Sequence, residues 1–142
     1  ERILFDMFGF RRTRELMESL ESQNFYELTP DELAKIQTCF DADFCNGDEG
    51  KVYIKDTFLN DGYLMDPHTA TCMKPHDTCC NPAIKTIAYS TAEWTKFSPV
   101  IDNALTGKVD AHDIDALESI SKTASLEIPA TIKGLFTKKV TQ

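Results

Sequence analysis

The amino-acid sequence predicts an α/β protein that is mostly helical and contains about two short parallel strands. Two observations lead to this class. Apolar residues recur at the spacing of a helix face along most of the chain, which indicates about seven or eight helices. Two short apolar runs, at 63–65 and 84–89, are too brief for helices, and a helix signal follows each of them. Because two strands make a poor sheet by themselves, we expect them to belong to a larger sheet.

The composition is that of an ordinary globular protein. The 142 residues are 42% hydrophobic and 27% charged, which is enough for one domain with a single core. The net charge of −8 disfavours nucleic acid and anionic membranes as partners. No apolar run reaches the roughly 18–20 residues of a membrane span, and we expect a cytoplasmic protein. The five cysteines are an odd number without the spacing of a disulfide framework, which favours reduced thiols.

The first third of the chain predicts three helices. An apolar stripe over residues 3–8 ends at Gly9, and a second stripe indicates a helix over about 12–22. Because no capping residue precedes the first stripe, we expect the chain to be a fragment of a longer protein. The sequence TPDE at 29–32 begins the third helix, since its threonine caps, its proline suits the first position and its glutamate completes a capping box.

The middle of the chain predicts the first strand–helix unit, at about 62–74. It follows a helix over 49–60 that ends at an Asp-Gly pair. After the strand, Asp66 caps a helix that has proline in its first position. Pro75 should stop this helix near Lys74, because a proline inside a helix removes a hydrogen bond.

The second strand–helix unit is predicted at about 84–107. Its strand leads into Ser90 and Thr91, and an amphipathic helix follows that Gly107 ends. A helical tail is predicted over 110–137, with helices around 114–120 and after Pro129.

Histidines and cysteines cluster in MDPHTATCMKPHDTCC at residues 65–80. The first histidine and the first cysteine share a helix face. A proline separates them from the second histidine, however, and the last two cysteines are adjacent, which suits a single metal ion poorly. We therefore favour an incidental cluster without metal. The alternative is a zinc-stabilised module, built on His68, Cys72, His76 and Cys79.

Polar side chains follow both predicted strands. Asp66 and His68 come after the first strand, and Ser90 and Thr91 come after the second. Ligands of open α/β sheets bind at the carboxyl ends of the strands. A helix N-terminus there favours anions, and a hydroxyl group can hydrogen-bond a ring nitrogen. The sequence therefore indicates a ligand site, with simple helix capping as the alternative.

Two blocks of the sequence resemble threonine synthase. GYLMDPHTA (62–70) and YSTAEWTKF (89–97) are similar, in order and spacing, to the DPHTA block and the Ser/Gly-Thr-Ala-His-Pro-Ala-Lys-Phe motif near the C-terminus of that family. The ER-x-LF opening and SLEIPATIKGLF (125–136) resemble it too, so the resemblance runs from residue 1 to about 136. It implies the C-terminal part of a tryptophan-synthase-β-like fold that binds pyridoxal 5′-phosphate (PLP).

The resemblance also implies a function and site residues. The family is a lyase of threonine biosynthesis that converts O-phosphohomoserine and water to L-threonine and phosphate, with PLP as the electron sink. Its STA threonine hydrogen-bonds the pyridine nitrogen, which carries over to Thr91, with Ser90 as a weaker candidate. By position, His68, Asp66 and Lys96 lie close to the site.

The second block departs from the family motif. Glu93, Trp94 and Thr95 replace the usual His-Pro-Ala, while Lys96 and Phe97 keep their places. An acidic residue at the edge of a site for phosphate argues against a phosphate role for this segment, including Lys96.

The family's Schiff-base lysine and its Gly-rich phosphate loop lie in an N-terminal segment that these 142 residues do not contain. We therefore expect no catalytic residue, no bound PLP and no activity in the chain by itself. Its expected partner is the missing N-terminal part of the same chain, and self-association through exposed apolar surface is a further expectation. The alternative is a small acidic helical module that shares this ancestry and binds another protein.

Overall fold

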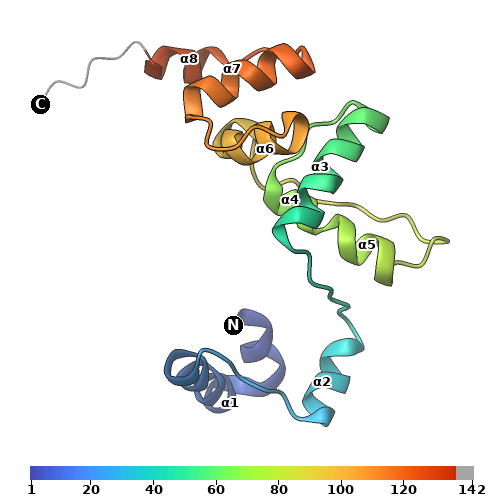
Figure 1. Ribbon diagram of the computed structural model, residues 1–142. Coiled ribbons are helices and arrows are strands. Elements are labelled where there is room, and N and C mark those ends of the chain that lie inside the picture. Colours follow the sequence, from blue (N-terminus) through green and yellow to red (C-terminus); the bar gives the residue numbers. More distant parts are fainter. Residues whose placement is uncertain (137–142) are drawn as a thin grey trace, which may run out of the picture. The chain divides into compact units, whose positions relative to one another are not determined.

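The computed structural model describes residues 1–136, which form helices joined by loops (Figure 1). They divide into two compact units, Glu1–Asp41 and a larger one that begins at Ala42, and each is described by itself. No helix within the described residues is long and apolar enough to cross a membrane.

The prediction of two short parallel strands is wrong. Residues 62–66 and 85–91 lack regular secondary structure, and no strand occurs anywhere within residues 1–136. The physical reason is that an apolar run indicates only that its side chains tend to be buried. A strand also needs a neighbouring strand that pairs with its N–H and C=O groups. Leu64 and Met65 are indeed buried, but Ile87 and Tyr89 are 74% and 78% exposed.

The smaller unit begins with α1 (Arg2–Gln23), which breaks at Gly9 as predicted. Gly9 has φ 77° and ψ 173°, a backbone conformation that favours glycine. The hydroxyl of Thr13 donates a hydrogen bond to the carbonyl oxygen of Gly9 at 2.9 Å. This carbonyl group therefore has a hydrogen-bond partner at the break in the helix. Asn24 ends the helix in the left-handed conformation.

The second helix of this unit, α2 (Pro30–Gln37), confirms the predicted capping box. The Thr29 hydroxyl accepts from the backbone N–H of Glu32 at 3.3 Å, and the Glu32 carboxylate accepts from the N–H of Thr29 at 2.8 Å. Lys35 then donates from its ammonium group to the carbonyl oxygen of Met7 at 2.7 Å, which joins α2 to α1.

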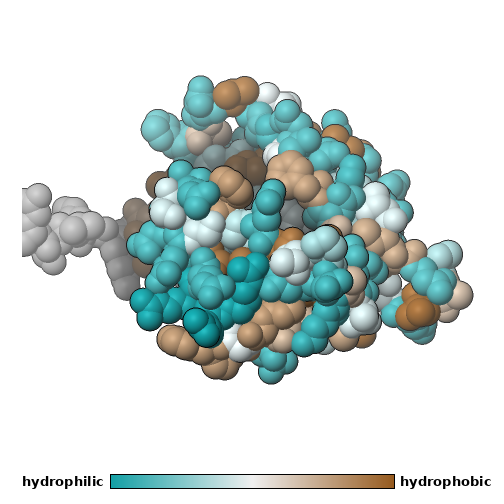
Figure 2. Space-filling model, turned by 90° about the horizontal axis from the view of Figure 1, so that it is seen from below, coloured by the Kyte–Doolittle hydropathy of each residue, from teal (hydrophilic) through white to brown (hydrophobic). Residues whose placement is uncertain are grey.

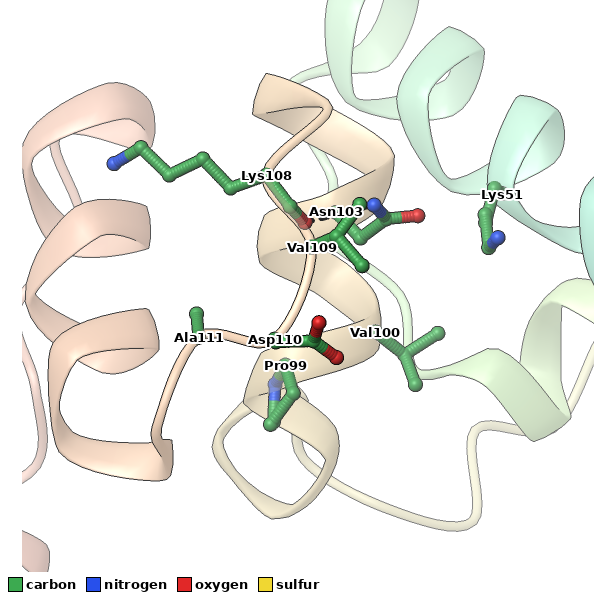
Figure 3. Close-up of a pocket in the computed structure, with 8 residues that line it drawn as sticks. All are labelled: Lys51, Pro99, Val100, Asn103, Lys108, Val109, Asp110 and Ala111. Carbon is green, nitrogen blue, oxygen red and sulfur yellow. Dashed lines mark hydrogen bonds between the residues drawn. The ribbon is translucent and has the colours of Figure 1, made fainter.

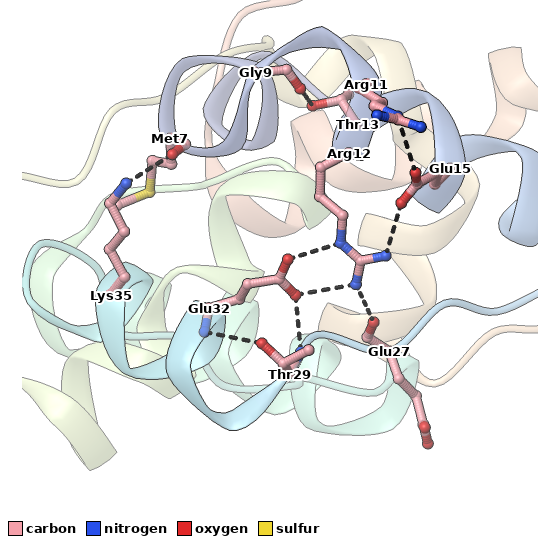
Figure 4. A network of polar contacts seen from close by, with 10 residues as sticks. All are labelled: Met7, Gly9, Arg11, Arg12, Thr13, Glu15, Glu27, Thr29, Glu32 and Lys35. Atoms are coloured by element: carbon pink, nitrogen blue, oxygen red, sulfur yellow. Dashed lines mark hydrogen bonds and ion pairs between the residues drawn. The ribbon is translucent and has the colours of Figure 1, made fainter.

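Arg12 and Glu32 form a second link between α1 and α2 (Figure 4). The guanidinium donates to both carboxylate oxygens, at 2.7 and 3.0 Å, in a bidentate pair. It also approaches Glu15 and the carbonyl oxygen of Glu27, each at 3.4 Å. The hydrogen bond from Arg12, followed by that from the N–H of Thr29, lowers the pKa of Glu32 from 4.5 to about 2.

We expect Arg12→Gln to lower the thermal unfolding midpoint of the smaller unit by a few degrees at pH 7. The folded-state pKa of Glu32 is depressed, so the pair stabilises the fold above about pH 4.5, and this contribution disappears as the pH falls toward 2. The difference between variant and wild type should therefore vanish in acid. Thermal unfolding followed by the helical circular dichroism signal at several pH values between 2 and 7 measures this difference. Arg14→Gln, which removes an exposed pair with Glu18, is the control, and equal effects of the two variants would contradict the prediction.

The larger unit contains the remaining helices. They are α3 (Gly47–Asp61), α4 (Pro67–Thr71), α5 (Met73–Cys79), the 3₁₀ helix η1 (Trp94–Phe97), α6 (Ser98–Thr106), α7 (Asp113–Ala124) and α8 (Ala130–Phe136). Helix α6 packs against α3 and α7, and α4 packs against α3. These contacts bury an apolar core that comprises Ile54, Leu64, Met65, Ala70, Trp94, Ile101, Ala104, Leu117, Ile120 and Ile128.

The predicted end of the helix near Lys74 is wrong. Helix α4 already ends at Thr71, and α5 continues past Pro75 to Cys79. Pro75 is the third residue of α5, where the backbone N–H has no partner within the helix in any case. Proline there costs no hydrogen bond, so it lies inside the helix without breaking it.

Candidate functional site

Asp66 organises the start of α4 from a fully buried position. One carboxylate oxygen accepts from the backbone N–H groups of His68 and Thr69, at 2.9 and 3.3 Å. The other accepts from the Thr69 hydroxyl. Burial by itself would raise the pKa of Asp66, but these hydrogen bonds outweigh it and lower the pKa. The buried carboxylate therefore holds the first turn of α4 in place.

The two motif blocks, 62–70 and 89–97, meet in space. The hydroxyl oxygens of Thr69 and Ser90 lie 3.4 Å apart, so the two side chains are in contact. The ring of His68 contacts the ring of Phe97 edge to face, with centroids 4.7 Å apart and planes at 81°. The structure therefore brings together residues that lie about twenty positions apart in the sequence.

Thr91 and Lys96 present their functional groups without strong protein partners. Thr91 is exposed and makes no side-chain hydrogen bond to the described residues. The Lys96 ammonium lies 5.4 Å from the centre of the Phe97 ring and forms no ion pair within the same range. The roles predicted for these residues, and for Ser90, His68 and Asp66, remain predictions.

A pocket of about 240 Å³ lies beside the two blocks. Ser90 belongs to its wall, and so do Tyr63, Glu93 and Trp94, which the sequence analysis did not select as site residues. The signal that could have identified two of them was already visible. Glu93 and Trp94 are positions where the chain departs from the motif of threonine synthase.

Comparisons with known proteins show what the sequence and the fold of this chain are similar to. No protein-family model matches the chain. Threonine synthase-like 1 from Homo sapiens, from Macaca fascicularis and from Pongo abelii is in each case 36% identical over 91 residues, which is 64% of this chain and 12% of the relative. The crystal structure of PLP-bound threonine synthase from Brucella melitensis superposes with a TM-score of 0.70 at 24% identity, over 97% of this chain and 26% of that one.

The chain has part of a threonine synthase-like PLP fold. It spans about an eighth of the length of the curated relatives and about a quarter of the structural neighbour. The match of nearly the whole chain agrees with the resemblance that its sequence carries from residue 1 to about 136.

One exposed hydroxyl among the described residues, that of Thr91, is of a type that suits a PLP ring. A hydroxyl is the type of group that can hydrogen-bond the pyridine nitrogen of PLP. The hydroxyl of Thr91 is exposed and unbonded within the described residues, so it is free for such a partner. The hydroxyl of Ser90 is already engaged, since it donates to the carbonyl oxygen of Ala92 at 3.2 Å.

A larger pocket, of about 560 Å³, lies on α3, α6 and the loop that joins α6 to α7 (Figure 3). None of the predicted site residues lines it. Its two lysines are engaged elsewhere, because Lys51 pairs with Asp48 at 3.1 Å and the ammonium of Lys108 donates to Ser119 at 2.9 Å.

The cysteines and histidines do not assemble into a metal site among residues 1–136. No three His, Cys, Asp or Glu side chains in this range are grouped so that they could hold a metal ion. All five cysteines are free thiols, and Cys72, Cys79 and Cys80 are exposed. The alternative of a zinc-stabilised module gains no support from this arrangement.

Proposed function

We propose that this chain is the C-terminal part of a PLP-dependent threonine synthase, which converts O-phosphohomoserine and water to L-threonine and phosphate. One observation carries the proposal. The DPHTA and STA blocks, distant in sequence, meet at Thr69 and Ser90 in a fold that matches PLP-bound threonine synthase over 97% of the chain. The motifs alone did not require this meeting.

In this proposal the residues of the chain have separate roles. The Thr91 hydroxyl hydrogen-bonds the pyridine nitrogen and orients the ring. Asp66 acts through α4, because its buried carboxylate holds the turn that carries His68 and Thr69 beside Ser90. The cofactor, when bound, supplies the electron sink. The neutral Thr91 leaves the nitrogen without a carboxylate that would hold a proton on it.

We further propose that the N-terminal part of the same protein covers the exposed apolar residues of segment 84–89. Ile84, Ile87 and Tyr89 are 66%, 74% and 78% exposed, although they are apolar and neighbours along the chain. Figure 2 shows hydrophobic residues, in brown, scattered over a mainly hydrophilic face. The relatives are about eight times as long as the matched segment, so they contain further chain that can supply the cover. The 142 residues alone should self-associate, which sedimentation at rising concentration measures.

Thr91→Val in the full-length gene product tests the proposed function. We expect phosphate release from O-phosphohomoserine to fall by about tenfold or more, because one hydrogen bond to the cofactor ring is worth roughly 1–2 kcal/mol. The visible absorption of bound PLP should also shift, since the environment of the pyridine nitrogen changes. Phosphate release and the absorption spectrum are both measured on the purified protein.

Thr91→Ser is the matched control, because it keeps the hydroxyl and should retain most of the activity and the wild-type spectrum. A wild-type protein that binds no PLP and releases no phosphate would refute the proposed function. Full activity and an unchanged spectrum in Thr91→Val would refute the role of Thr91 alone.

A further inference from the structure

We infer that the pocket of about 240 Å³ formed by Tyr63, Ser90, Glu93 and Trp94 binds a small organic ammonium ion. This inference goes beyond the proposed function and does not depend on it. The pocket is formed by this chain alone, and the argument uses neither the cofactor nor its chemistry.

The negative charge of the pocket lining favours a cation as the ligand. Glu93 is the one charged residue among the described residues that line it. Its side chain is exposed and forms no ion pair within residues 1–136, so its charge is not neutralised by a lysine or arginine of this part of the chain. The whole chain carries a net charge of −8, which adds to the attraction for cations and to the repulsion of anions.

The walls of the pocket suit an organic cation better than a metal ion. Trp94 is anchored in the core at 8% exposure, and Tyr63 is about half exposed at 49%. Aromatic rings attract alkylammonium ions through their π faces. Leu64 and Leu126 add apolar surface for a short alkyl group. A single carboxylate is too few ligands for a hard metal ion.

Ser90 completes the site as a hydrogen-bond acceptor. Its hydroxyl proton is directed to the carbonyl oxygen of Ala92 at 3.2 Å. The oxygen of Ser90 therefore keeps lone-pair capacity for an N–H donor. This oxygen and the carboxylate of Glu93, which both belong to the pocket lining, are acceptors for an ammonium group. A volume of about 240 Å³ lies below the roughly 300–1,000 Å³ of sites for drug-sized ligands, which points to a small amine.

The fluorescence of Trp94 provides a direct test, because Trp94 is the only tryptophan of the chain. The 142-residue protein is titrated with n-butylammonium, n-butyrate and n-butanol at constant ionic strength. These probes share an alkyl chain and differ in charge. We expect a saturable change in fluorescence with n-butylammonium only. A saturable change of equal strength with n-butyrate, or no saturable change with n-butylammonium, would overturn the inference.

Glu93→Gln removes the charge of the side chain and keeps its shape. Because Glu93 is exposed, the variant should fold like the wild type. We expect n-butylammonium to bind this variant about fivefold more weakly, as fits the loss of one exposed charge contact. Glu118→Gln, an equal change of charge at an exposed position of α7 outside the pocket, should bind like the wild type. Equal affinities of the two variants would show that Glu93 does not recognise the cation and would overturn the inference.

Discussion

Replacing Ile101 with alanine is expected to lower the free energy of unfolding of the larger unit by about 2–5 kcal/mol. Ile101 is fully buried on α6, the helix that packs against both α3 and α7. It shares one core cluster with Ile54 and Ile120, which are also fully buried. Truncation removes apolar contacts and leaves a cavity where three helices meet, and both losses destabilise the fold.

Urea unfolding followed by the fluorescence of Trp94 measures this change, because Trp94 belongs to the same core. Val100→Ala is the matched control on the adjacent position of α6. Val100 is 41% exposed, so its truncation should change the free energy of unfolding by less than about 1 kcal/mol. Equal losses in the two variants would show that α6 does not bury the face that carries Ile101.

Asp66→Ala is expected to cost about 2–3 kcal/mol of unfolding free energy. The change removes the N-cap of α4 and leaves the Thr69 hydroxyl, which is buried, without its carboxylate partner. Asp66→Asn should cost less, because an amide oxygen still accepts from the N–H groups of His68 and Thr69. Urea unfolding at pH 7 measures both losses, and an alanine variant no less stable than the asparagine variant would contradict the capping role.

The pH dependence of the same variants tests the charge of Asp66. Its pKa is lowered in the folded protein, so the ionised carboxylate stabilises the fold above its ordinary value of 3.8, and this stabilisation is lost as the pH falls below that value. The asparagine variant cannot ionise at this position. Its stability should therefore decline less steeply than that of the wild type as the pH falls below 3.8.

Local signals in the sequence predicted most of the helices well. The capping box at Thr29 and the Asp66-Pro67 start act within a few residues of the chain, so they are visible before folding. Gly9, Gly62 and Gly107 have positive φ angles at a helix break or a helix end, as their positions beside apolar stripes suggested. The last helices begin at Asp113 and Ala130, close to the predicted tail segments.

The predictions of two strands and of a helix end before Pro75 were wrong for a common reason. Whether 84–89 becomes a strand depends on a pairing partner, and whether Pro75 ends a helix depends on its distance from the helix start. Neither quantity can be read from the apolar pattern of the segment itself.

The sequence alone determined the capped helix starts at Pro30 and Pro67, the acidic charge and the family resemblance carried by the blocks at 62–70 and 89–97. Each of these depends on residues that are neighbours along the chain. Only the tertiary structure placed Thr69 against Ser90 and gathered Tyr63, Glu93 and Trp94 into one pocket. The reason is that these contacts arise when α3, α4, α6 and α7 bury a common core, a collective result of packing that no local pattern records.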